Sequence, residues 1–339
     1  MAEMVNKMFE QIYSYEALLM AWKKTQRLKR YRQDVIMFRR SLDENLIIIQ
    51  NELMWKTYKV SDYHNYIIYE PKKRLISSLP LRDRVVQHAL VGVIEPVVDK
   101  YFMYDSHACR KGHGVKLAID RFIHNSKSSK YCLKCDISSY FFSINHDILM
   151  GLYRKKIFCK DTLWLIETVV RSVDNPGLPI GNLLSQLSAN LYLHELDRYL
   201  KHDLKIKKYI RYMDDFVIFG DDYNELNNIK TLIVNFVRDN LALTLSDRKS
   251  KILETRKGVE FCGFRCYPTH CIVKKDTRLR NRKRLQQLSE GLRSGEVSPE
   301  QFINSISSIL GHSMYSRNYS YRKMLNDYLS ENTGGKDVL

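Results

Sequence analysis

The chain of 339 residues carries 55 Lys and Arg against 38 Asp and Glu, which gives it a formal charge of +17. Its 44% of hydrophobic and 27% of charged residues exclude a disordered chain, a collagen and a small disulfide scaffold. The apolar runs are too short to span a membrane, the N-terminus lacks a secretory signal pattern, and seven scattered cysteines favour reduced thiols, so we expect a cytoplasmic protein. The positive charge favours nucleic acid as a partner.

Segments with helical apolar spacing and short strand-like runs follow one another in an irregular order. This order indicates an α+β fold rather than a doubly wound parallel sheet. The expected elements are a helix over 5–33, a strand at 66–69, a helix over 83–98, a strand at 130–136, a long buried helix over 182–205, strands at 209–213 and 216–219, and a basic helical tail from about 275.

Two aspartates, Asp214 and Asp215, stand between two strand-like runs, which predicts a hairpin. Adjacent like charges repel each other unless a cation lies nearby. A third acid, Asp136, ends another apolar strand, and carboxylate oxygens are ligands that Mg²⁺ prefers. We therefore predict that the three acids hold a pair of Mg²⁺ ions, although an isolated Asp-Asp pair is more often an ordinary exposed turn.

The segment Tyr212-Met213-Asp214-Asp215, taken with Asp136, resembles the palm signature of reverse transcriptases. Other segments resemble the remaining blocks of that family in the same order, so that the likeness covers about residues 65–270. These segments are Arg74–Ser77 with Asp83–His88, Ala108–Gly114, Asp136–Phe142, Gly177–Gln186, Lys249–Lys251 and Phe261–Phe264.

This resemblance implies a right-hand polymerase fold, with fingers, a palm whose antiparallel sheet carries the catalytic acids, and a helical thumb. It divides the chain into an N-terminal helical extension (1–60), the first part of the fingers (61–130), the palm with an insertion (131–270) and a basic helical thumb (271–339). The implied activity is that of an RNA-directed DNA polymerase with two Mg²⁺ ions, for which Mn²⁺ can substitute. Its implied partners are template RNA, the cDNA/RNA duplex and dNTPs, with no membrane.

The resemblance also assigns site residues. Asp136, Asp214 and Asp215 are the catalytic acids and metal ligands, with Asp215 the weaker ligand and the Ile137 carbonyl an additional one. The implied dNTP contacts are Lys72, Arg74, Phe141, Ile180, Gly181 and Lys249, with Lys251 an alternative to Lys249. The implied template and primer contacts are Arg110, Lys111, Asn182, Gln186, Phe261, Gly263, Arg278, Arg280, Arg282 and Lys283.

Within the family, the run from Leu178 to Gln186 departs from the Pro-Gln-Gly pattern of group II intron enzymes. It resembles the reverse transcriptases of diversity-generating retroelements, as do Ala108–Gly114 and Gly311-His312. That subgroup implies cDNA with errors at template adenines, a retroelement RNA as template, a small oligomeric helical accessory protein, and a bacterial or phage-infected host. The tail after the palm is thumb-sized, so we expect no maturase, endonuclease or RNase H module.

Several alternatives stay open. The chain could be an anti-phage defence reverse transcriptase of the same fold, or a non-catalytic RNA-binding scaffold. The basic stretch Lys23–Arg40 could bind template RNA or the accessory protein. Cys132 and Cys135 have half the spacing of a zinc site, but their position in a buried-looking strand favours ordinary apolar packing.

Phe141 follows Asp136 where the family has an aromatic gate beneath the deoxyribose, and the alternative is a core residue like Phe142. If Phe141 excludes a 2′-hydroxyl, the variant Phe141→Ala will raise ribonucleotide incorporation by about tenfold or more. Single-nucleotide extension with competing rNTP and dNTP measures this change. Phe142→Ala is the matched control, and an equal effect of the two variants would contradict the gate.

Overall fold

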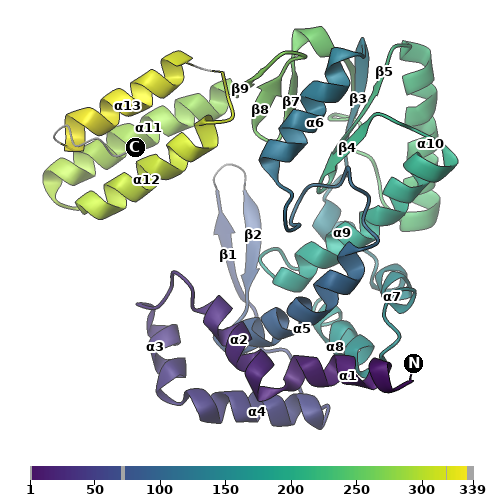
Figure 1. Ribbon diagram of the computed structural model, residues 1–339, viewed down its shortest axis with the longest axis vertical. Coiled ribbons are helices and arrows are strands. Elements are labelled where there is room, and N and C mark those ends of the chain that lie inside the picture. Colours follow the sequence, from purple (N-terminus) through teal and green to yellow (C-terminus); the bar gives the residue numbers. More distant parts are fainter. Residues whose placement is uncertain (1, 70–72, 318, 334–339) are drawn as a thin grey trace. The chain divides into compact units, whose positions relative to one another are not determined.

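The computed structural model describes residues 2–69, 73–317 and 319–333. The chain forms two compact units (Figure 1). The first unit contains Met1–Arg110, Asp136–Ile206 and Thr231–Ser246, and the second contains Lys111–Cys135, Lys207–Lys230 and Asp247–Leu339. The predicted boundaries of fingers, palm and thumb stay a prediction. No helix in the described part of the chain has both the length and the apolar character needed to cross a bilayer.

Helices dominate the first unit, and the four N-terminal helices contact the long helix α5 (Leu81–Asp99). These are α1 (Ala2–Tyr13), α2 (Tyr15–Thr25), α3 (Gln33–Arg40) and α4 (Leu42–Met54). The prediction of one helix over 5–33 is wrong, because Ser14 is extended (ψ 145°) and its hydroxyl accepts a hydrogen bond from the Ala17 N–H at 3.3 Å. Serine is a favoured N-cap, so it ends α1 and starts α2.

The remaining elements of the first unit include one hairpin, in which β1 (His64–Ile68) pairs with β2 (Arg74–Ser78). The predicted long buried helix is α9 (Leu183–Arg198), which continues as a π-helical turn, η2 (Tyr199–Asp203). The others are η1 (Tyr140–Ser143), α7 (His146–Arg154), α8 (Lys160–Val170) and the later part of α10 (Tyr223–Leu241).

The second unit contains two sheets whose described strand pairs are antiparallel. Four strands lie in the order β4-β5-β3-β6: β4 (Tyr209–Tyr212), β5 (Asp215–Gly220), β3 (Tyr131–Asp136) and β6 (Lys251–Glu254). The second sheet is β7 (Val259–Phe261), β8 (Phe264–Cys266) and β9 (Cys271–Val273), and η3 (Thr255–Lys257) precedes it. The mixture of helices and antiparallel strands confirms the α+β prediction.

One apolar core holds the second unit together. Phe122 of α6 (Val115–Lys127) packs between Phe219 and Phe261, with ring centroids 5.0 and 5.6 Å away. Cys132 is fully buried in this core, and burial raises its thiol pKa to about 12. The C-terminal helices pack side by side next to the β7-β8-β9 sheet (Figure 1); they are α11 (Lys275–Ser294), α12 (Pro299–Ser313) and α13 (Tyr319–Thr333).

The N-terminus of α9 is capped by a side chain from another helix. Asn182 stands at the N-cap position but makes no side-chain cap bond. Instead, Gln87 of α5 accepts hydrogen bonds through Oε1 from the N–H groups of Leu183 and Leu184, at 3.0 and 3.3 Å. The first N–H groups of a helix have no partner within the helix, so this buried amide satisfies two of them.

Replacing Gln87 with methionine keeps the length of the side chain and removes the acceptor. We expect Gln87→Met to lower the free energy of unfolding by about 2 kcal/mol, because two buried N–H groups lose their partner. Urea denaturation measures the loss, and faster hydrogen exchange at Leu183 and Leu184 localises it. Gln87→Glu keeps the acceptor oxygens and should restore slow exchange there; equal exchange in both variants would contradict the cap.

Candidate active site

The acidic hairpin forms as predicted, with its turn one residue earlier. β4 and β5 pair so that Tyr212 faces Asp215, which leaves Met213 and Asp214 as the two-residue loop. Met213 has a φ of +58°, in the left-handed region that such tight turns use. Asp215 is therefore the first residue of β5, and the two carboxylates belong to different parts of the hairpin.

Two cations of the protein itself accompany this acidic turn. Arg211 is fully buried, and its Nη1 donates a hydrogen bond to the Met213 carbonyl at 3.1 Å. Lys134 of β3 forms an ion pair with Asp215, with Nζ 3.0 Å from Oδ2. The repulsion between adjacent acids, from which the sequence predicts bound metal, is thus partly balanced by the chain.

Asp136 is the last residue of β3, and β3 is the sheet neighbour of β5. Side chains alternate along a strand, so Asp136 shares a strand face with Lys134. The Asp136 carbonyl accepts a hydrogen bond from Ser246 N at 2.8 Å, and Ser138 N donates to Thr244 O at 2.9 Å. These bonds flank the bridge between Ile137 and Leu245, so the Ile137 carbonyl is not used in that pairing.

The carboxylates of Asp136 and Asp214 have the donor chemistry of a Mg²⁺ site, because hard divalent cations prefer oxygen ligands. Asp215, by contrast, already shares its charge with Lys134. Over 2–69, 73–317 and 319–333, the side chains of His, Cys, Asp and Glu form no group of three or more that could hold a metal ion. The pair of ions held by three acids therefore stays a prediction.

Ile180 and Gly181 lie beside strand β2 in the first unit. The Ser77 N–H donates a hydrogen bond to the Ile180 carbonyl at 2.9 Å. Gly181 has a φ of +116°, and a Cβ there would come within 3.2 Å of Ile76 Cγ2. The positive φ strains any residue with a Cβ, and a Cβ would also need Ile76 to shift by a few tenths of an ångström, so this position favours glycine.

Phe141 is joined to the same segment through its backbone, since its carbonyl accepts from Leu178 N at 2.7 Å. The Phe141 side chain is half-buried, whereas Phe142 is 48% exposed. The alternative treats Phe141 as a core residue like Phe142. Phe142 is not a core residue, so the premise of that alternative is wrong. Arg74 is exposed at the start of β2, and Lys72 lies outside the described residues.

Arg110 is a structural residue rather than an available template contact. Its guanidinium pairs with Asp99 at 2.6 Å and donates to the carbonyls of Met103 and Ser106, each at 2.8 Å. Its side chain is only 7% exposed and lies over the Phe102 ring. These contacts hold the loop after α5, so we do not include Arg110 among the nucleic-acid contacts.

Two other predicted template or primer residues have buried side chains. Phe261 is in the core of the second unit, stacked on Phe122, because β7 turns that face inward. Asn182 is buried, and its amide donates to the Tyr63 hydroxyl at 3.4 Å. Gly263, in the β7–β8 turn, has a φ of +84° and lies against the ring of His312, which stacks on Phe264.

The basic residues of α11 divide between two faces. Lys275, Arg278 and Arg282 line a cavity of about 370 Å³ together with Tyr321 and Met324 of α13. Arg280 lies nearer His312, whose pKa falls because of burial and the charge of Arg280. The other predicted contacts with water-accessible side chains are Lys111, Lys249 and Lys283, which are exposed, and Gln186, which is half-buried on α9.

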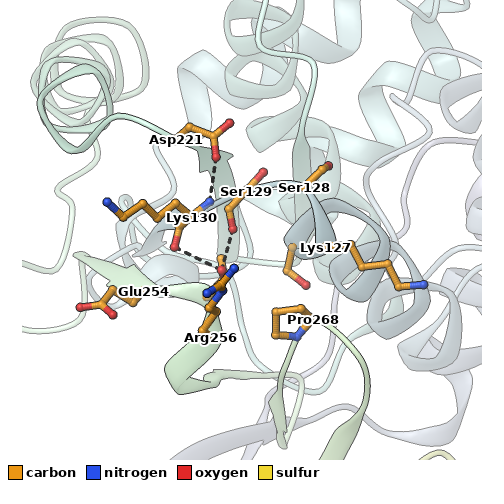
Figure 2. Close-up of a pocket in the computed structure, with 10 residues that line it drawn as sticks. Lys127, Ser128, Ser129, Lys130, Asp221, Glu254, Arg256 and Pro268 are labelled. Atoms are coloured by element: carbon orange, nitrogen blue, oxygen red, sulfur yellow. Dashed lines mark hydrogen bonds between the residues drawn. The ribbon is translucent and has the colours of Figure 1, made fainter.

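A larger cavity of about 630 Å³ lies at the other end of the palm strands (Figure 2). Residues next to the start of β3 and the ends of β5 and β6 line it, away from the acidic turn. Its polar groups tie these strand ends together: Asp221 accepts from Lys130 N at 2.8 Å, and the Thr255 hydroxyl donates to Ser129 O at 2.6 Å (Figure 2).

Comparison with known families assigns the chain. Residues 65–266 match the family described as reverse transcriptase (RNA-dependent DNA polymerase), which is more than half of the sequence. The chain belongs to the reverse transcriptase family. This match confirms the extent of the resemblance inferred from the ordered segments.

Several curated proteins are similar at low identity. YkfC of Escherichia coli is 25% identical over 280 residues, covering 68% of this chain and 73% of YkfC. The group II intron-encoded protein LtrA of Lactococcus lactis is 23% identical, covering 57% of this chain and 44% of LtrA. A putative COX1/OXI3 intron 2 protein of Saccharomyces cerevisiae is 22% identical, covering 54% of this chain but only 29% of that protein.

Solved structures of telomerase share the fold. The apo telomerase of Candida tropicalis has a TM-score of 0.52 at 14% identity, covering 81% of this chain and 57% of the telomerase chain. A Candida albicans telomerase with a telomeric RNA fragment has the same TM-score at 11% identity and covers 83% of this chain. These likenesses confirm the predicted right-hand polymerase fold.

Proposed function

We propose that this protein is an RNA-directed DNA polymerase that copies a template RNA into cDNA. The observation that carries this proposal is the β4–β5 hairpin with Asp214 in its turn, beside the strand that ends in Asp136. Membership of the reverse transcriptase family supports it. A scaffold without catalysis has no need for adjacent acids that the chain must balance with Arg211 and Lys134.

In this proposal Asp136 and Asp214 hold two Mg²⁺ ions, with the Ile137 carbonyl as an additional ligand. When bound, these ions polarise the primer 3′-hydroxyl and neutralise the leaving pyrophosphate. Asp215 contributes negative charge but is held by Lys134. The donor set consists of carboxylate and carbonyl oxygens, which suits Mg²⁺ and allows Mn²⁺.

Most of the nucleotide contacts lie in the first unit in this proposal, whereas Lys249 belongs to the second unit. Arg74, exposed on β2, binds the triphosphate, since a guanidinium is a bidentate partner of phosphate. Phe141 excludes a ribose 2′-hydroxyl. Ile180 and Gly181 face the nascent pair, and their main chain is fixed against β2 and supports that role. Lys249 is the proposed pyrophosphate-side cation.

The nucleic-acid contacts are proposed for the basic side chains of α11. Arg278 and Arg282 line one groove and Lys283 is exposed, so several cations are available to the phosphates of an RNA–cDNA duplex. Phosphate contacts position a duplex without reading its sequence. A polymerase that copies any template needs this kind of contact.

We further propose that the enzyme serves a diversity-generating retroelement, with a retroelement RNA as template and a small helical accessory protein as partner. The resemblance of Leu178–Gln186, of Ala108–Gly114 and of Gly311-His312 to that subgroup supports this finer assignment. Ile180 adds a physical reason, because an apolar side chain cannot hydrogen-bond to the nascent base pair as a polar one can.

The polymerase proposal is tested with Asp214→Asn. This substitution removes one carboxylate charge with little change of shape, so we expect cDNA synthesis from a defined RNA with Mg²⁺ to fall at least about 100-fold. Asp239→Asn, an exposed acid paired with Arg238, is the control and should retain full activity. Full synthesis by Asp214→Asn would refute the assigned chemistry.

The mutagenic proposal is tested at Ile180. We expect Ile180→Gln to lower misincorporation opposite template adenine by about threefold to tenfold, because one added hydrogen bond helps to hold the correct pair. Sequencing of the cDNA products gives the error rate at each template base. Ile180→Val, which keeps an apolar branched side chain, serves as the control; equal adenine errors in the two variants would exclude a role for this side chain.

A further inference from the structure

Lys134 makes two strong contacts that no sequence motif predicts. Its Nζ lies 3.0 Å from Asp215 Oδ2 and 2.6 Å from the Glu260 carbonyl oxygen. The Lys134 side chain is 18% exposed, and that of Asp215 is 25% exposed, so the ion pair is largely screened from water. One ammonium group therefore joins strands β3, β5 and β7 within the second unit.

The neighbours of Lys134 explain why its ammonium is directed to Asp215. Lys251 of β6 stands directly opposite Lys134 in the β3–β6 register, so the two lysines share one face of the sheet. Like charges in opposite positions repel each other. β5 lies on the other side of β3, and Asp215 offers the compensating charge there.

The second acceptor of Lys134 is itself anchored. The Glu260 carboxylate pairs with Lys274, with Nζ 2.5 Å from Oε2, while its backbone carbonyl accepts from Lys134. Cys262, in the turn that follows β7, has a raised pKa because it is buried and because Asp215 lies close. The acidic hairpin and the β7–β8 hairpin are therefore neighbours, and Lys134 bonds to both.

We propose that Lys134 is a positioning residue that fixes the Asp215 carboxylate against the β7–β8 hairpin and limits its contribution to metal binding. This inference rests on the proposed polymerase function. In this arrangement Asp214 and Asp136 are the principal metal ligands. The Asp215 carboxylate is held in one orientation, and its charge is partly neutralised by Lys134. A purely structural lysine would affect stability alone, whereas Lys134 in this role affects turnover and metal affinity in opposite directions.

The test compares Lys134→Met with Lys134→Arg and with Lys130→Met. Methionine keeps the length and removes the charge, arginine keeps the charge, and Lys130 is an exposed lysine at the other end of the same strand, away from the acids. Two quantities are measured: the turnover number against the KM for dNTP, and Mn²⁺ affinity by electron paramagnetic resonance on the protein without nucleic acid.

We expect Lys134→Met to lower turnover about tenfold or more with little change in KM, because Asp215 loses its fixed orientation. Mn²⁺ affinity should rise about tenfold, because the Asp215 carboxylate is released from its ion pair with Lys134 and becomes available to the metal. Lys134→Arg should recover most of the turnover, and Lys130→Met should match wild type in both measurements. In an Asp215→Asn background, most of the affinity gain from Lys134→Met should disappear.

Unchanged or weaker Mn²⁺ binding in Lys134→Met would overturn the proposal, as would an affinity gain that persists in the Asp215→Asn background. If Lys134→Met does not fold, Lys134→Arg and the Asp215→Asn single variant still test the pair through Mn²⁺ affinity. Failure of the polymerase proposal is a separate outcome, because it shows as wild-type protein that makes no cDNA, while the Mn²⁺ measurement needs no turnover.

Discussion

The acidic turn imposes the main constraint on the second unit, because the β4–β5 hairpin must hold two adjacent carboxylates close together despite their mutual repulsion. Two cations place positive charge beside this turn: Arg211 in β4 of the same hairpin, and Lys134 in the neighbouring strand β3. Both cations are held in β-strands, so their positions depend on sheet register rather than on flexible loops. The two cations therefore reduce the repulsion between the adjacent carboxylates from fixed positions.

The first unit meets a different constraint, which is to hold a short loop, Gly177–Gly181, without regular structure. Main-chain hydrogen bonds do most of this work: Gly177 N donates to Ile144 O at 3.0 Å, and Leu178 N donates to Phe141 O at 2.7 Å. Gln87 then satisfies the start of α9 directly after the loop. A loop fixed by its neighbours on both sides is held rigidly, as the role in nucleotide selection that we propose for it requires.

Local sequence patterns predicted those elements that are determined by neighbouring residues in the chain. The β-rich runs around Asp214 and the apolar run ending in Asp136 gave the right strands, within a residue. The helix over 5–33 failed because a single serine, Ser14, caps a new helix. The burial of Arg110 and Phe261 could not be predicted locally, because their partners, Asp99 and Phe122, are supplied by the fold. Lys134 carried one weak signal, a charge in a buried strand on the face of Asp136.

The hydrogen bonds that hold the loop Gly177–Gly181 determine which of its side chains can change without disturbing the fold. This bears on the role in fidelity that we propose for Ile180. Ile180 is fixed by its carbonyl, which accepts from Ser77 N at 2.9 Å, and any side chain leaves that bond in place. Gly181 is more restricted, because its φ of +116° strains any residue with a Cβ and the nearby Ile76 would have to shift. The side chain at position 180 can therefore change without moving the strand that supports it, so the selectivity that we propose for this position could change independently of the fold.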